Sequence, residues 1–270
     1  MIREITLGQY YQSDSLIHKL DPRTKIIITM IFLISLFLID SIAVYIIPFL
    51  FLFIEIKTSK VPFKFIIKGM KAIIMLLTIT VLFNIFLTPG DPIFTIWKIN
   101  ITMEGIIIAI QMAIRLVFLI IGSSLMTLTT TPTQLTDGLE KLLRPLNYIK
   151  VPVAEIAMMM SIALRFIPIL LEETDKIIKA QLARGADFES KSIIKKVKSY
   201  VPILVPLFIS AFRRANDLAL AMEARCYRVG AKRTKMKPLI YNNSDFISYA
   251  LILVYLAVVI IVNTYLKGLV

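Results

Sequence analysis

Long apolar runs constrain the fold of this chain more than any other feature of its sequence. They occupy residues 26–39, 42–54, 72–87, 105–128 and 246–266. A helix needs about 20 apolar residues to cross the hydrocarbon core of a bilayer, so the last two runs can span it alone. The first two are shorter and are separated by Asp40 and Ser41, which favours a tight helical hairpin. Hydrophobic residues make up 57% of the chain, and the pattern predicts an all-α, polytopic membrane protein.

The charge of the chain indicates how it lies in the membrane. It has 31 Lys and Arg against 18 Asp and Glu, a net charge of +13. Basic residues gather on the cytoplasmic side of membrane proteins, and a cytoplasmic N-terminus leaves only Lys98 and Lys267 outside. Nucleic-acid binding would also explain the charge, but the basic residues flank or interrupt apolar helices instead of forming a separate soluble domain. We therefore expect a multi-pass protein with a cytoplasmic N-terminus.

The segment between residues 131 and 239 differs from the membrane runs because charged residues recur along its apolar helices. Its pattern predicts two long helices, over about residues 152–184 and 192–228. Three internal prolines are expected to bend or break them, namely Pro168, Pro202 and Pro206. The first helix carries the i,i+4 charge pair Glu172–Lys176, which marks a solvated face.

These contrasts predict three parts. Residues 1–130 form an N-terminal membrane domain with a cytosolic N-terminal segment, and residues 131–239 form cytosolic amphipathic helices that lie against something apolar. Residues 240–270 form a C-terminal transmembrane helix.

A short repeat closes both long helices. Ala180-Gln-Leu-Ala-Arg184-Gly185 and Ala221-Met-Glu-Ala-Arg225-Cys226 share the pattern Ala-x-x-Ala-Arg-(small). A single arginine there is explained by the helix dipole, which favours cations near a C-terminus. The repetition favours a further role, because a slim helix tip with a rigid guanidinium fork can enter a groove and pair with a carboxylate.

The chemistry of an enzyme is not found in the sequence. None of the nine glycines precedes a lysine, so no Gly-x-x-x-x-Gly-Lys-(Ser/Thr) phosphate loop occurs. One cysteine and one histidine make a Cys/His metal site implausible. Arg115 lies inside a predicted span and either has a functional role or pairs within the helix bundle. Asp21-Pro22 is typical of a helix start, with Asp as the cap and Pro at the first helical position. We expect no catalysis, no cofactor and no metal.

Several segments together resemble the transmembrane T component (EcfT) of energy-coupling factor (ECF) transporters. They are the two arginine motifs, Leu16–Lys25 with its Leu-Asp-Pro-Arg core, Met158–Pro168, Met222–Arg228 and Lys232–Met236. The resemblance covers most of the chain, with Cys226 standing where the short motif has glycine.

This resemblance implies a non-catalytic coupling subunit of a prokaryotic plasma-membrane transporter for vitamins or micronutrients. In that family the T component joins two cytosolic ABC-type ATPases to a membrane-embedded, substrate-binding S component, and its two long cytosolic helices cross. Arg184 and Arg225 would contact the two ATPases, together with the flanking small residues Ala183, Gly185, Ala224 and Cys226. Apolar residues on the long helices would contact the S component: Ile156, Met159, Met160, Ala163, Ile167, Leu170, Val205 and Phe208. Two other functions stay open, a stand-alone permease with Arg115 and Arg165 lining an anion path and a membrane scaffold without ATPase partners.

Overall fold

The chain divides into two compact units. The computed structural model describes residues 10–71, 73–89, 92–96, 99–186, 193–230, 235–236 and 238–267. One unit, here the paired-helix unit, comprises Leu139–Pro238. The other, here the membrane unit, comprises the described residues up to Gly138 and those from Leu239 onward. The α7 helix (Pro132–Leu143) continues across the boundary between the two at Gly138.

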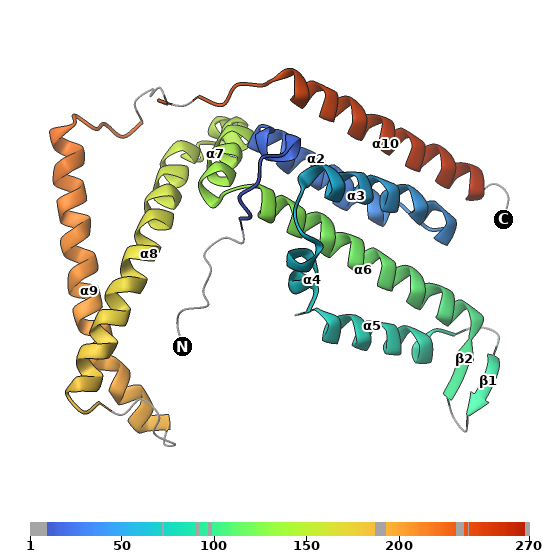
Figure 1. The fold of residues 1–270 in the computed structure, drawn as a ribbon, viewed down its shortest axis with the longest axis horizontal. Coiled ribbons are helices and arrows are strands. Elements are labelled where there is room, and N and C mark those ends of the chain that lie inside the picture. The colour runs from blue at the N-terminus through green and yellow to red at the C-terminus, as the bar shows by residue number, and fades with distance from the viewer. Residues whose placement is uncertain are drawn as a thin grey trace. The chain divides into compact units, whose positions relative to one another are not determined.

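Most helices of the membrane unit match the apolar runs of the sequence. These are α2 (Pro22–Phe37), the 3-10 helix η1 (Ile42–Tyr45) with α3 (Ile46–Ser59), α5 (Ile74–Leu87), α6 (Met103–Thr129) and α10 (Asn243–Lys267). Two short helices, α1 (Leu16–Lys19) and α4 (Phe63–Lys71), lie outside those runs. Figure 1 shows α2, α3, α6 and α10 side by side, with α5 along α6. The α2–η1–α3 segment is the predicted hairpin, and it turns at Asp40 and Ser41. The protein is therefore a predominantly helical, polytopic membrane protein.

A β-hairpin was not predicted. Strands β1 (Pro92–Ile96) and β2 (Ile99–Thr102) pair antiparallel between α5 and α6, where the sequence analysis placed no strand. Alternating Ile, Phe and Thr residues suit paired strands, but the segment is short and adjoins two long apolar runs. Lys98 lies outside the described residues.

Aromatic and aliphatic side chains of four helices form the core of the membrane unit. Phe32 and Leu36 of α2 pack with Leu125 of α6 and with Tyr255 of α10. Gly122 allows α6 to approach α2 closely, because a methyl group there would lie 2.8 Å from the Phe32 ring. Many large apolar side chains on the outer faces are exposed, as expected of helices that contact lipid.

Polar groups at one end of this bundle tie α6 and α10 to the turn between α2 and η1. Arg115 donates from Nη2 to the Ile39 carbonyl at 2.9 Å and from Nε to the Tyr45 hydroxyl at 3.0 Å. Asn263 donates to the Leu38 carbonyl at 2.8 Å, and Lys267 forms an ion pair with Asp40. The structure thus places Arg115 in contacts within the bundle, the second of the two alternatives.

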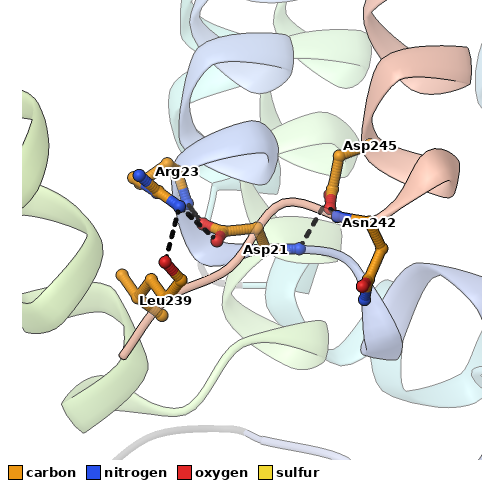
Figure 2. Close-up of polar contacts among 5 residues, drawn as sticks. All are labelled: Asp21, Arg23, Leu239, Asn242 and Asp245. Atoms are coloured by element: carbon orange, nitrogen blue, oxygen red, sulfur yellow. Dashed lines mark hydrogen bonds and ion pairs between the residues drawn. The ribbon is translucent and has the colours of Figure 1, made fainter. Parts of the chain in front are cut away.

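The opposite end is held by a cluster of five residues, here the cap cluster: Asp21, Arg23, Leu239, Asn242 and Asp245 (Figure 2). Asp21 caps α2, as predicted, by accepting from the Arg23 backbone N–H at 2.8 Å. Asp245 is fully buried, and its two carboxylate oxygens accept from different helix starts. Oδ1 accepts from the Asp21 N–H at 2.9 Å, and Oδ2 accepts from the Asn242 N–H at 2.8 Å.

Lys25 adds further hydrogen bonds at this end of the bundle. Its ammonium donates to the Thr129 carbonyl at 2.8 Å, at the C-terminus of α6, and to the His18 carbonyl at 3.1 Å. Carbonyls in the last turn of a helix have no intrahelical donor, and a cation there also complements the helix dipole. The starts of α2 and α10 and the end of α6 are therefore joined at one level.

Replacing Asp245 with Ala should lower the free energy of unfolding by about 2–5 kcal/mol, because two buried N–H groups lose their acceptor. Thermal or denaturant unfolding of the purified protein in detergent measures this. Ser244→Ala, an exposed change in the same helical turn, should stay within about 0.5 kcal/mol of the wild type. Equal effects of the two substitutions would contradict the assigned role of Asp245.

Candidate functional site

Two long helices carry the repeated arginine motif. They are α8 (Val153–Ala183) and α9 (Ile193–Ala224), with the 3-10 helix η2 (Arg144–Ile149) preceding α8. The helices run antiparallel, since Gln181 near the end of α8 contacts Pro202 near the start of α9. Further along, Glu173 accepts from the Arg214 guanidinium at 2.9 Å. Figure 1 shows α8 and α9 crossing.

The three internal prolines do not end these helices, which continue through Pro168, Pro202 and Pro206. A proline lacks the N–H that would bond to the carbonyl four residues earlier, so Pro206 leaves the Pro202 carbonyl without its helical donor. The Gln181 side-chain amide of α8 donates to that carbonyl at 3.4 Å. Pro206 thus frees a carbonyl of α9 that accepts a hydrogen bond from α8.

The α8 helix ends in a Schellman motif at the first arginine motif. The Ala186 N–H donates to the Gln181 carbonyl at 3.0 Å, and the Gly185 N–H donates to the Leu182 carbonyl at 2.9 Å. Gly185 has a φ of +85°, the left-handed conformation that this motif requires. Arg184 is the residue at which the helix ends.

The α9 helix ends in the same way at the second motif. The Tyr227 N–H donates to the Met222 carbonyl at 3.0 Å, and the Cys226 N–H donates to the Glu223 carbonyl at 2.8 Å. Cys226 has a φ of +57°. The helix stops at Ala224, about one turn before the expected Arg228. Arg184 and Arg225 therefore occupy equivalent positions in two equivalent helix ends.

This geometry adds to the interpretation of the small residue that follows each arginine. The sequence argument noted that Gly185 and Cys226 are both small. The structure adds a backbone requirement, a positive φ, that glycine meets without strain and cysteine meets at a cost of about 1–2 kcal/mol. Cysteine in place of glycine therefore makes the same conformation more strained at the α9 tip than at the α8 tip.

Both tips are open to solvent. Ala183, Arg184 and Gly185 are exposed, as are Ala224, Arg225 and Cys226. Among the described residues, neither guanidinium has a side-chain hydrogen bond or an ion pair. Because the helices are antiparallel and the end of α8 lies beside Pro202, 23 positions before Arg225, the two arginines are on the order of 35 Å apart. Residues 232–234 of the basic segment that follows lie outside the described residues.

Small residues of α9 face the apolar side of α8 in the seam between the helices. Ala211, Ala215 and Ala219 line a shallow apolar pocket with side chains of α8, among them Ile162, Phe166 and Leu170. Leu170, predicted to contact a partner, therefore lines the seam instead of lying wholly on the outer surface.

The other predicted partner-contacting residues are more exposed. Met159 and Phe208 have exposed fractions of 57% and 61%, and Ile156, Met160 and Val205 are exposed as well. Ala163 is exposed and Ile167 is half-buried. These residues form an apolar surface on α8 and α9 with no covering element among the described residues.

By length and composition, α8 also meets the criteria for a membrane-spanning helix. The others that do so in the described residues are Ile42–Ser59, Met103–Thr129 and Asn243–Lys267. The sequence argument placed α8 at an apolar surface instead, because Glu172, Glu173 and Asp175 follow its apolar half. A whole helix with these charges is costly to place in lipid.

Comparison with known proteins identifies the family. Residues 13–236 match the family described as CbiQ, cobalt transport protein. The energy-coupling factor transporter transmembrane protein EcfT of Clostridium kluyveri is 57% identical over 263 residues, covering 96% of this chain and 97% of the relative. The EcfT proteins of Ruminiclostridium cellulolyticum and Bacillus subtilis are 54% and 47% identical, covering 97% and 91% of this chain and 98% and 93% of those relatives. The chain belongs to the family of ECF transporter transmembrane T components. It is thus the transmembrane component of a transporter of this class.

The two helix ends provide a test of the backbone requirement. Cys226→Gly should stabilise the protein by up to about 1 kcal/mol by removing left-handed strain, and Gly185→Ala should destabilise it by about 1 kcal/mol. Hydrogen exchange of the amides that close α8 and α9 would locate each effect at its own helix end. The assignment is wrong if both substitutions are neutral or if both act in the same direction.

Proposed function

We propose that this chain is the coupling subunit of its transporter and that Arg184 and Arg225 contact two cytosolic ABC-type ATPases. The observation that carries the proposal is the pair of exposed arginines on equivalent helix ends, on the order of 35 Å apart. A single groove cannot hold both tips at that separation, whereas two ATPase subunits offer one groove each. Each guanidinium can form a bidentate pair with a carboxylate at the base of its groove.

The exposed apolar surface of α8 and α9 contacts the membrane-embedded S component in this proposal. It contains Ile156, Met159, Met160, Ala163, Val205 and Phe208, with Ile167 and Leu170 bordering it. Methionine side chains repack easily and suit a surface that meets a moving or variable partner. ATP binding would draw the ATPases together, shift the tips and change the angle between α8 and α9, which tips the S component to accept or release a vitamin or micronutrient.

The proposed orientation places the N-terminus, α8 and α9 on the cytoplasmic side of the cell membrane. Its support is the excess of basic residues over the whole segment 131–239, which has 19 Lys and Arg against 10 Asp and Glu. The permease alternative receives less support, because the Arg115 guanidinium is engaged by Tyr45 and Ile39. A scaffold without ATPases would not explain why equivalent arginines lie at the ends of both helices.

Replacing Arg184 or Arg225 with Ala should weaken association with the ATPases by roughly 10- to 100-fold, since a charge-assisted contact is worth about 1.5–3 kcal/mol. The double variant should abolish co-purification of the ATPases and ATP-dependent uptake. Arg213→Ala is the matched control, because it removes an exposed arginine from the same α9 helix away from the tip. Unchanged assembly and uptake in the double variant would refute the ATPase contacts.

The single cysteine of the chain is a natural probe of the α9 tip. Cys226 is exposed, and on the cytoplasmic side it should resist a membrane-impermeant maleimide in intact cells but react in inside-out vesicles. Adding the ATPases should slow the reaction, because a bound ATPase covers the tip. Labelling in intact cells would overturn the orientation, and labelling unaffected by the ATPases would oppose the contact at Arg225. A Cys226→Ala variant controls for reaction with other proteins.

A further inference from the structure

The two places where the backbone leaves and re-enters the membrane unit are both held by the first turn of α2. The chain leaves that unit at Gly138 within α7 and returns at Leu239 before α10. These positions are 101 residues apart by their numbers, yet each contacts residues between Asp21 and Ile26. Within the part of the chain that the structure describes, the backbone links the paired-helix unit to the membrane helices at these two points.

The first point is a close contact at a glycine. A methyl group on Gly138 would lie 3.0 Å from Ile26 Cδ1, 3.1 Å from Pro22 Cβ and 3.3 Å from the Pro22 carbonyl carbon. Pro22 is held rigid by its ring, so α7 lies directly against the start of α2. Gly138 is buried, and no larger side chain fits there without displacing one of the two helices.

The second point is a clamp on the returning chain. Arg23 Nη2 donates to the Leu239 carbonyl at 3.2 Å, and the guanidinium carbon lies 3.8 Å from the centre of the Tyr241 ring. The same guanidinium also binds Asp21, with Nε at 3.0 Å from Oδ1 and Nη2 at 2.8 Å from Oδ2. Figure 2 shows the Arg23 guanidinium bonded to both Asp21 and Leu239.

The clamp is separable from the helix cap. Asp21 caps α2 through the backbone N–H of residue 23, which any side chain at that position retains. Asp245 joins α2 and α10 through the Asp21 and Asn242 amides, also without the Arg23 side chain. The guanidinium therefore adds a link to Leu239 and Tyr241 that the starts of the two helices do not need for their own capping.

We propose that Arg23 is a positioning residue of the transport cycle, which fixes the returning chain so that movement of the paired helices is delivered to α2 and α10. Gly138 fixes the outgoing chain on the same turn. When the contacts of Arg23 with Leu239 and Tyr241 are lost, the segment after Pro238 moves with the paired helices. The membrane helices then move less. This inference rests on the proposed coupling function.

The test uses the whole transporter, with its ATPases and its substrate-binding partner, reconstituted in liposomes. Arg23→Gln should leave assembly and the ATPase rate within about twofold of the wild type and reduce substrate uptake per ATP hydrolysed by about threefold or more, the range expected of a residue that transmits coupling. Lys19→Gln is the matched control, because it removes an exposed cation close by. It should not change uptake per ATP.

A second pair of variants covers the case in which Arg23→Gln fails to fold. Tyr241→Phe keeps an aromatic face under the guanidinium and should couple like the wild type, whereas Tyr241→Leu removes that face and should lower uptake per ATP. Tyr241 is partly exposed, so neither change opens a cavity in the core.

Two outcomes would overturn the proposal. The first is unchanged uptake per ATP in Arg23→Gln and Tyr241→Leu. The second is a parallel loss of assembly and uptake, which would show that the Arg23 contacts only stabilise the fold. The proposed function is tested separately, with the wild-type complex alone. If that complex does not couple uptake to ATP hydrolysis, the proposed function is wrong.

Discussion

A buried carboxylate shared by two helix starts is the interaction on which the membrane unit depends. Asp245 has no exposed surface, and an isolated anion in such a place would be strongly destabilising. Two backbone N–H groups compensate for the lost water, one at the cap of α2 and one at the cap of α10. Both helix N-termini also carry partial positive charge toward it. The carboxylate is stable only when α2 and α10 begin side by side, so it fixes their relative depth.

The same end of the bundle contains a complementary cation. Lys25 is almost fully buried and donates to a carbonyl at the C-terminus of α6. Two helix starts with a shared anion and one helix end with a cation form a polar layer in which each charge opposes a helix dipole of the opposite sign. At the far end of α2, Arg115, Asn263 and Lys267 bind the turn that follows. The 16 residues of α2 between these layers have a length of about 24 Å, somewhat less than the hydrocarbon thickness of about 30 Å.

Local patterns predicted much of this fold, and the features they missed depend on distant partners. The apolar runs predicted the membrane helices, and Asp21-Pro22 predicted the start of α2. The role of Asp245 was not predicted, because its second acceptor bond goes to a residue 224 positions away. The polar run before α10 contains a capping signal, Asn-Asn-Ser-Asp, which indicates the helix start but not the contact with α2. At the tips, residue types predicted the two equivalent arginines, whereas the positive φ of Cys226 could not be inferred from a side chain that rarely adopts it.

The seam between α8 and α9 is built in a way that permits the angle between them to change. Alanines at every fourth position of α9 present a smooth surface to α8, without the large interlocking side chains that fix a crossing angle. Polar contacts in the described part of this seam include the Glu173–Arg214 ion pair, a hydrogen bond between Ser210 and Glu173, and the longer bond from Gln181 to the Pro202 carbonyl. A charged pair with flexible side chains can follow a small rotation, and the carbonyl freed by Pro206 is near one end of the pair. Rotation about this seam would move the two tips in opposite directions, because they lie at opposite ends of antiparallel helices. Under the proposed function, a relative movement of two bound ATPases would therefore change the crossing angle of α8 and α9.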